Sequence, residues 1–159
     1  MTELHAKVLT VSDGVASGAR DDAGGRGVVE RLQAEGYEVI VHAVVPDGRE
    51  SVGEALVELS EDFAGLIVTT GGTGFGPRDL TPEGTEVVLD RPAPGLAEAM
   101  RLTSPLGRLS RATAGTRGRA LILNTPGSPK GAVECLTAVL DVVPHVLQLL
   151  RGDTAHHPH

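Results

Sequence analysis

Residues 65–70, which read Gly-Leu-Ile-Val-Thr-Thr, constrain the fold more than any other segment. The run is apolar on both faces, which is typical of a central strand in a parallel sheet covered by helices on both sides. Two β-branched runs, at 6–11 and 38–45, predict earlier strands. Two helical patterns separate these strands: Val28, Val29 and Leu32 ending at Gly36, and Val52, Ala55, Leu56 and Leu59. This alternation predicts an α/β fold with right-handed crossovers.

The second half predicts further helices and a strand pair. Thr81 is expected to cap a helix that begins at Pro82, and residues 95–102 are expected to form another. Residues 111–116 and 119–124 read as two strands that pair around Gly115. An apolar stripe from 133 to 150 predicts helix, split in two by Pro144. We expect one domain over residues 1–152 and a disordered tail over 153–159.

Composition argues against two classes of partner. The chain has 14 Lys and Arg against 21 Asp and Glu, a formal net charge of −7, and only 2% aromatic residues. Nucleic-acid binding depends on clustered cations and on stacking side chains, so we expect no nucleic-acid partner. No apolar run approaches the ~20 residues that cross a bilayer, so we expect no membrane partner. The single Cys135 and the lack of a signal-peptide pattern predict a cytoplasmic protein.

The strongest chemical signal follows the central strand. Residues 69–83 read Thr-Thr-Gly-Gly-Thr-Gly-Phe-Gly-Pro-Arg-Asp-Leu-Thr-Pro-Glu. Open α/β sheets bind ligands at the carboxyl ends of their strands, and glycines let backbone N–H groups turn toward an anion. The segment lacks the Gly-Lys-Ser/Thr of a P-loop, and Pro77 replaces the last glycine of a dinucleotide fingerprint counted from Gly72. We therefore predict a phosphate site at Gly71, Gly72, Thr73 and Gly74, the alternative being a tight turn without a ligand.

Two acidic residues are candidates for metal binding or catalysis. Asp79 follows the glycine-rich turn and has the chemistry to ligate Mg²⁺ or position a nucleophile. Its alternative roles are an Arg–Asp pair with Arg78 or a loop cap. Asp47 follows the second strand and precedes Glu50 by three residues, which is close to a capping box. An N-cap role for Asp47 is therefore the alternative, although it would place the carboxylate at the same sheet edge.

Other polar turns are expected at that edge. Ser12 and Asp13 follow the first strand, where a plain turn is the alternative. Ser110 and Arg111 offer a hydroxyl and a guanidinium. The turn Pro126-Gly127-Ser128-Pro129-Lys130 offers a hydroxyl, backbone N–H groups and an ammonium. Each signal is weak alone, and it is their convergence on one sheet edge that predicts a site.

Taken in order, these motifs resemble the signature of the molybdopterin-binding fold. That fold occurs in molybdenum-cofactor biosynthesis proteins of the MogA/MoaB type and in the G domain of gephyrin. The resemblance extends over almost the whole chain. Its motifs are Val11-Ser12-Asp13, Val45-Pro46-Asp47, Thr70–Gly74 with Arg78–Glu83, Leu109-Ser110-Arg111, Asn124–Lys130 and Leu149–Gly152.

The resemblance implies a three-layer α/β/α sandwich with a mostly parallel sheet, assembled as a homotrimer. It implies molybdopterin adenylyltransferase activity, with ATP and molybdopterin as substrates and Mg²⁺ as cofactor. The family's two essential acidic positions match Asp47 and Asp79, which would also be the Mg²⁺ ligands. Residues 71–74 would hold phosphate, and Ser110 with Pro126, Gly127, Ser128 and Lys130 would help hold the pterin, while Ser12 and Asp13 complete the candidate substrate-binding set.

The resemblance leaves a second reading open, a module that binds molybdopterin or a nucleotide without turnover. A molybdenum-insertion enzyme would act downstream on the product. That step itself is disfavoured for this chain, because the insertion proteins carry the fold within a much longer chain. One departure from the family is Gly84, where Ala is frequent. Gly is destabilising there by roughly 0.5–1 kcal/mol, which predicts a looser first helical turn.

Overall fold

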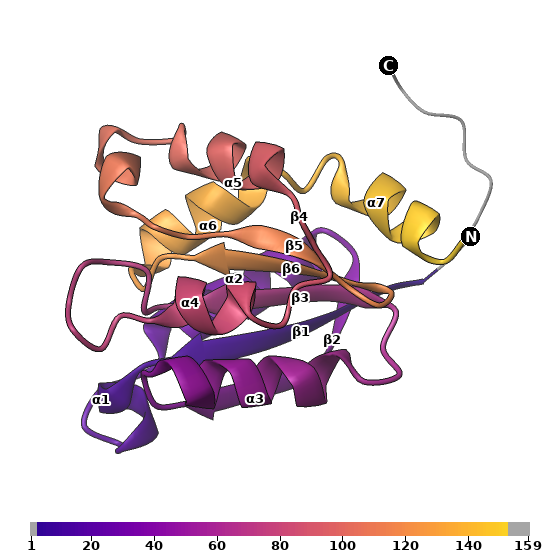
Figure 1. Ribbon diagram of the computed structural model, residues 1–159. Helices are drawn as coiled ribbons and strands as arrows, with labels where there is room; N and C mark the ends of the chain where they lie inside the picture. Colours follow the sequence, from indigo (N-terminus) through magenta and orange to yellow (C-terminus); the bar gives the residue numbers. More distant parts are fainter. Residues whose placement is uncertain (1–2, 153–159) are drawn as a thin grey trace.

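In the computed structural model, which describes residues 3–152, six strands form one sheet in the order β2-β1-β3-β6-β5-β4 (Figure 1). The strands β1, β2, β3 and β6 are parallel, and β5 and β4 extend the sheet as antiparallel strands. The predicted mostly parallel sheet is therefore confirmed. The strands are β1 (Leu4–Val11), β2 (Tyr37–Val45), β3 (Gly65–Thr70), β4 (Arg91–Pro92), β5 (Ala114–Arg117) and β6 (Ala120–Thr125).

Helices cover both faces of this sheet, because consecutive strand residues point to opposite sides. One core cluster joins Val8, Leu66 and Leu121 to α2, α5, α6 and α7, and the other joins Leu9 and Ile67 to α3. In Figure 1, α3 lies in front of the sheet. The expected three-layer sandwich is confirmed. The helices are α1 (Asp13–Ala16), α2 (Ala23–Ala34), α3 (Arg49–Ser60), α4 (Thr81–Glu86), α5 (Pro94–Arg101), the 3-10 helix η1 (Pro105–Leu109), α6 (Pro129–Thr137) and α7 (Val143–Leu150).

The strand register brings several loops to one edge of the sheet. Every residue of β3 and β6 is buried, as predicted for β3. Thr70 pairs with Thr10 on one side and with Thr125 on the other, so β1, β3 and β6 end at the same level. Beneath this edge, the buried Asn124 amide donates to the hydroxyl oxygens of Thr69 and Thr85. The loops after these strands therefore start from a fixed, hydrogen-bonded base.

The predicted pairing of two strands in the second half is right, but the predicted turn is wrong. The strands are β5 and β6, and they reverse at Gly118, whose φ is +58°. Gly115 lies inside β5, where a Cβ would come within 2.5 Å of the Arg91 carbonyl oxygen and 2.6 Å of Leu89 Cδ1. Gly115 is thus explained by close approach of β4.

The predicted start of α4 is also wrong. Leu80 is the N-cap, and Thr81 is already helical. The Thr81 hydroxyl instead donates to the Gly71 carbonyl, which fastens the helix to the glycine-rich turn. The expectation of a loose turn at Gly84 fails as well, because a Cβ there would lie 2.6 Å from the Arg49 carbonyl oxygen and 2.9 Å from Val52 Cβ. Gly84 lets α4 pack closely against α3.

The remaining helix predictions hold. Gly36 follows α2 with a φ of +89°, the expected left-handed position. The apolar stripe near the C-terminus forms α6 and α7, with Pro144 in the first turn of α7. Among the described residues, no helix combines the length and apolar character that crossing a membrane requires. The predicted tail, 153–159, lies outside the described residues.

Candidate substrate site at the carboxyl edge of the sheet

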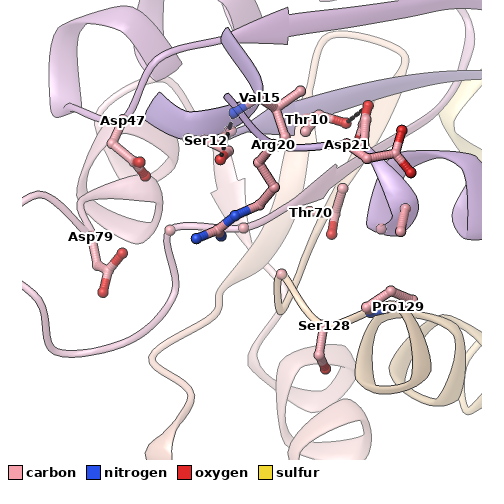
Figure 2. Close-up of a pocket in the computed structure, with 17 residues that line it drawn as sticks. Thr10, Ser12, Val15, Arg20, Asp21, Asp47, Thr70, Asp79, Ser128 and Pro129 are labelled. Atoms are coloured by element: carbon pink, nitrogen blue, oxygen red, sulfur yellow. Dashed lines mark hydrogen bonds between the residues drawn. The ribbon is translucent and has the colours of Figure 1, made fainter. Parts of the chain in front are cut away.

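A cavity of about 400 Å³ opens where β1 and β3 end (Figure 2). We call it the first cavity. Seven of the predicted site residues line it: Ser12, Asp47, Gly71, Gly72, Asp79, Gly127 and Ser128. Its other lining residues are Thr10, Val11, Val15, Arg20, Asp21, Asp22, Ala23, Gly24, Thr70 and Pro129.

The glycine-rich turn is shaped by contacts with neighbouring segments. Gly71 and Gly72 have φ values of +103° and +70°, a conformation that L side chains rarely adopt. The Gly71 N–H donates to the Thr125 carbonyl at 3.0 Å, and the Gly72 carbonyl accepts from the Thr81 N–H at 3.1 Å. A Cβ on Gly71 would collide with the carbonyl oxygen of Val11. These glycines are therefore required by the backbone itself.

The same turn leaves donors available. The backbone N–H groups of Gly72, Thr73 and Gly74 donate to none of residues 3–152. Two helices also begin at the first cavity: α2 through Ala23 and Gly24, and α6 through Pro129. Free N–H groups and helix N-termini both favour negative charge. The predicted phosphate chemistry is therefore compatible with this turn.

Asp47 is held near two other carboxylates. Its Oδ2 accepts from the backbone N–H of Asp13 at 3.0 Å. Burial raises the pKa of Asp47, and the neighbouring charges of Asp13 and Asp79 raise it further. The carboxylate of Asp13 pairs with Arg78 through contacts of 2.6 and 3.0 Å. This ion pair holds the pKa of Asp13 below its usual value. Asp47 is consequently a partly buried carboxylate that lies close to the negative charges of Asp13 and Asp79.

The contacts of Asp47 and Asp79 decide between their alternative roles. The N-cap of α3 is Gly48 without a side-chain cap bond, so the N-cap interpretation of Asp47 is wrong. Arg78 pairs with Asp13, so an Arg–Asp pair between neighbours 78 and 79 is also wrong. The loop-cap interpretation of Asp79 is right, because its Oδ2 accepts from the Gly76 N–H at 2.9 Å.

Arg111 forms hydrogen bonds to the carbonyl groups of the glycine-rich segment. Its backbone N–H donates to the Thr73 carbonyl and its Nε to the Gly74 carbonyl, both at 2.8 Å. Its two terminal nitrogens donate to the Asp79 carbonyl and to the Glu83 carboxylate, and this holds the pKa of Glu83 below its usual value. The carbonyls of residues 73 and 74 thus point toward Arg111, and neither residue lines the first cavity.

A second cavity of about 250 Å³ adjoins the first. Four predicted residues line it, namely Ser110, Pro126, Ser128 and Lys130, beside Met100, Arg101, Thr103, Ser104, Leu106, Gly107, Ala112, Asn124, Gly131, Glu134 and Cys135. Ser128 lines both cavities, and its hydroxyl caps α6 by accepting from the Gly131 N–H at 3.2 Å. The predicted residues are therefore divided between two neighbouring cavities, while Asp13, Thr73 and Gly74 line neither.

Sequence reasoning missed the segment between β1 and α2, which supplies Arg20, Asp21 and Asp22 to the first cavity. The Asp22 side chain caps α2 through the Gly25 N–H and accepts a hydrogen bond from the Thr10 hydroxyl, both at 2.9 Å. The Nε2 of His42 lies 3.0 Å from the same carboxylate. An Asp before a helix is a recognised N-cap signal that would have placed Asp22. No local pattern marks Arg20.

Known proteins agree with this architecture. Residues 7–145 match the MoCF_biosynth family, described as a probable molybdopterin binding domain. The chain is 38% identical to a molybdopterin adenylyltransferase of Helicobacter pylori, over 96% of this chain and 91% of the relative. It is 38% identical to gephyrin of Dictyostelium discoideum over 91% of this chain, which is 22% of that protein. The structure of the molybdopterin biosynthesis enzyme MoaB from Thermus thermophilus superposes with a TM-score of 0.87 at 47% identity, covering 94% of this chain and 98% of that one. The chain belongs to the MoCF_biosynth family of molybdopterin binding domains.

Proposed function

We propose that this chain is a molybdopterin adenylyltransferase that transfers AMP from Mg-ATP to the terminal phosphate of molybdopterin and releases pyrophosphate. The observation that carries the proposal is the pair of adjoining cavities that share Ser128. A transferase with two substrates needs two neighbouring sites whose contents meet. The relatives named molybdopterin adenylyltransferase support the same reaction.

The first cavity is suited to the nucleotide phosphates. The N–H group of Gly72, which donates to none of residues 3–152, and the N-termini of α2 and α6 supply fixed positive dipole ends there, and the N–H groups of Thr73 and Gly74 continue the same turn beyond the cavity. The second cavity, with Ser110, Pro126 and Lys130, would hold molybdopterin. In the reaction, a terminal phosphate oxygen of molybdopterin bonds to the α-phosphorus of ATP. The bond from that phosphorus to the bridging oxygen breaks, and its electron pair leaves with pyrophosphate, so catalysis consists mainly of positioning and charge neutralisation.

Asp47 and Asp79 fit a divalent cation. The Oδ1 atom of each carboxylate accepts no hydrogen bond from any of residues 3–152, although one oxygen of each is fixed by a backbone N–H. Burial raises the pKa of Asp47, and the neighbouring charges of Asp13 and Asp79 add a smaller repulsion that a cation would relieve. Carboxylate oxygens are the ligands that Mg²⁺ prefers. Bound Mg²⁺ would neutralise charge on the phosphate oxygens, and the two carboxylates would hold it beside the glycine-rich turn.

We infer one molybdopterin-binding domain over residues 1–152, a homotrimeric assembly, a cytoplasmic location and a molybdenum-insertion enzyme as the downstream consumer of adenylyl-molybdopterin. Each follows from the family resemblance or from the sequence.

The deciding experiment measures pyrophosphate release from ATP by the whole chain with molybdopterin and Mg²⁺. We expect release that depends on all three components. If the chain binds molybdopterin tightly but releases no pyrophosphate, the binding-module alternative replaces the enzyme. Omitting molybdopterin serves as the control, because simple ATP hydrolysis would persist without it.

A further inference from the structure

Arg20 supplies the first cavity with its only positively charged side chain among the described lining residues. Four carboxylates, those of Asp21, Asp22, Asp47 and Asp79, line the same cavity. Figure 2 shows the Arg20 side chain extending from its loop into the cavity, toward the glycine-rich turn. A polyanion entering a cavity with this excess of acidic groups needs a cation to receive it.

Within the described part of the chain, the guanidinium of Arg20 has no protein partner. It forms no ion pair or side-chain hydrogen bond with any residue in the described range 3–152. Asp21, its neighbour in sequence, is held by Arg26 through two contacts of 2.6 and 2.7 Å. Asp22 is occupied by the Thr10 hydroxyl and the Gly25 N–H. The nearest acidic side chains in sequence therefore have other partners.

The other arginines beside the site are already committed. Arg78 is bound to Asp13 and to the Asp47 carbonyl, and Arg111 is bound to the Gly74 carbonyl, the Asp79 carbonyl and Glu83. The donors of these two guanidinium groups are used in contacts between segments of the protein. Arg20 differs from both, because its donors remain available for a ligand.

The loop directs Arg20 into the cavity. The Arg20 N–H donates to the Gly14 carbonyl at 3.0 Å, which closes the turn after α1. A Cβ on Gly14 would lie 3.3 Å from Arg20 Cβ and 3.6 Å from Arg20 Nε. The arginine side chain thus runs along the bare backbone of Gly14, and a larger residue at 14 would press on it.

We propose that Arg20 is a nucleotide-binding residue that binds the β- and γ-phosphates of ATP. This inference rests on the proposed function for the identity of the nucleotide. A guanidinium presents a planar fork of donors that matches two phosphate oxygens at once. Arg20 lines the first cavity alone, whereas the cations of the second cavity are Arg101 and Lys130. Arg20 therefore acts on the phosphate chain that leaves as pyrophosphate.

Calorimetric titration of the whole chain with Mg-ATP, AMP and molybdopterin separately tests the assignment. For Arg20→Gln we expect the Kd for Mg-ATP to rise roughly ten- to hundredfold, the usual effect of losing a charged hydrogen bond. Affinity for AMP and for molybdopterin should stay unchanged. Arg20→Lys should recover part of the loss, because it keeps the charge without the fork. The matched control is Arg119→Gln, an exposed arginine next to the Gly118 turn at the opposite end of the sheet, which should leave all three affinities unchanged.

Three outcomes would overturn the inference: unchanged Mg-ATP binding by Arg20→Gln, a loss confined to molybdopterin, or an equal loss for AMP. A wild-type chain that binds no Mg-ATP would overturn it too. The proposed function fails separately. If the chain binds Mg-ATP through Arg20 but releases no pyrophosphate, the transferase proposal is wrong and this inference stands. If the wild-type chain turns over normally and Arg20→Gln binds Mg-ATP with unchanged affinity, the transferase proposal stands and this inference is wrong.

Discussion

Asp13 and Asp47 exchange two hydrogen bonds. The N–H of Asp13 donates to Oδ2 of Asp47 at 3.0 Å, and the N–H of Asp47 donates to Oδ1 of Asp13 at 3.1 Å. This reciprocal pair ties the segment after β1 to the segment after β2, and Arg78 closes it by contacting the Asp13 carboxylate and the Asp47 carbonyl. The orientation of Asp47 therefore depends on a partner 34 residues away in the chain.

Asp47→Asn should separate chemistry from stability. We expect turnover to fall by about 10²-fold or more, the scale seen when a preorganised charge-stabilising group is lost. The amide oxygen can still accept from the Asp13 N–H, so the fold should persist. Pyrophosphate release measured beside thermal melts checks both, and a variant with normal turnover would remove Asp47 from the catalytic site.

The pH dependence of that variant has a defined sign. The pKa of Asp47 is raised in the folded chain, so its ionisation opposes folding. The associated stability is present below the usual carboxyl pKa and is lost as pH rises through the folded-state value. Asn does not ionise, so without Mg²⁺ the Tm of Asp47→Asn should exceed that of wild type near neutral pH, and the gap should close in acid. Added Mg²⁺ should raise the Tm of wild type more than that of the variant.

Asp79→Asn should also reduce turnover by about 10²-fold or more if Asp79 holds the metal and phosphates. Its Oδ2 accepts from the Gly76 N–H, a bond that an amide oxygen can keep, so the melting temperature should change little. A large drop in Tm with full turnover would instead assign Asp79 to the loop cap alone.

Gly74→Val should abolish nucleotide or pterin binding in a folded chain. A Cβ at this position would lie 3.1 Å from Asp79 Oδ2, and the branched side chain would crowd both that carboxylate and the free N–H groups of the turn. Calorimetry with Mg-ATP and molybdopterin, beside circular dichroism, checks the expectation. Unchanged binding would mean that the turn is only structural.

Gly84→Ala should destabilise the protein even though Ala is the better helix former. The added Cβ would lie 2.6 Å from the Arg49 carbonyl oxygen, forcing α4 away from α3, and such overpacking typically costs about 1–3 kcal/mol. Gly95→Ala is the matched control, since no atom lies near its Cβ position in α5 and Ala is favoured there by roughly 0.5–1 kcal/mol. Chemical denaturation of both variants should give opposite signs.

The assembly is tested by light scattering. The family resemblance predicts a homotrimer, so the scattering mass should be near three times the chain mass of 16.4 kDa. A monomer at micromolar concentration would contradict the homotrimer without touching the fold.

The sheet and its layers were predictable, because they follow from local periodicity. A run that is buried on both faces, such as β3, is typical of a central strand in a parallel sheet with helices on both sides. The errors at Gly115, Thr81 and Gly84 share one cause. In each case a residue was interpreted from its immediate neighbours, while its role is set by a segment distant in sequence: β4 for Gly115, the glycine-rich turn for Thr81 and α3 for Gly84.

The site was predictable to the level of the sheet edge and no further. Strand ends and polar turns indicated where residues such as Asp47 and Ser128 would gather. The shape of the first cavity depends on how closely α2 approaches the turn before α6, since both Gly24 and Gly127 line it and a Cβ on Gly24 would lie 2.8 Å from the Gly127 carbonyl oxygen. The position of Arg20 in the first cavity could not be predicted, because an arginine in an irregular loop carries no periodic signal.

Because Ser128 borders both cavities, the two compartments are separated there by a single short turn. A bisubstrate inhibitor can exploit that thin partition: a phosphate chain seated in one compartment, joined over Ser128 by a short tether to a pterin-like ring in the other. Once one half is bound, the second half binds at the high effective concentration that the tether sets, so such a compound should exceed either fragment in affinity by orders of magnitude.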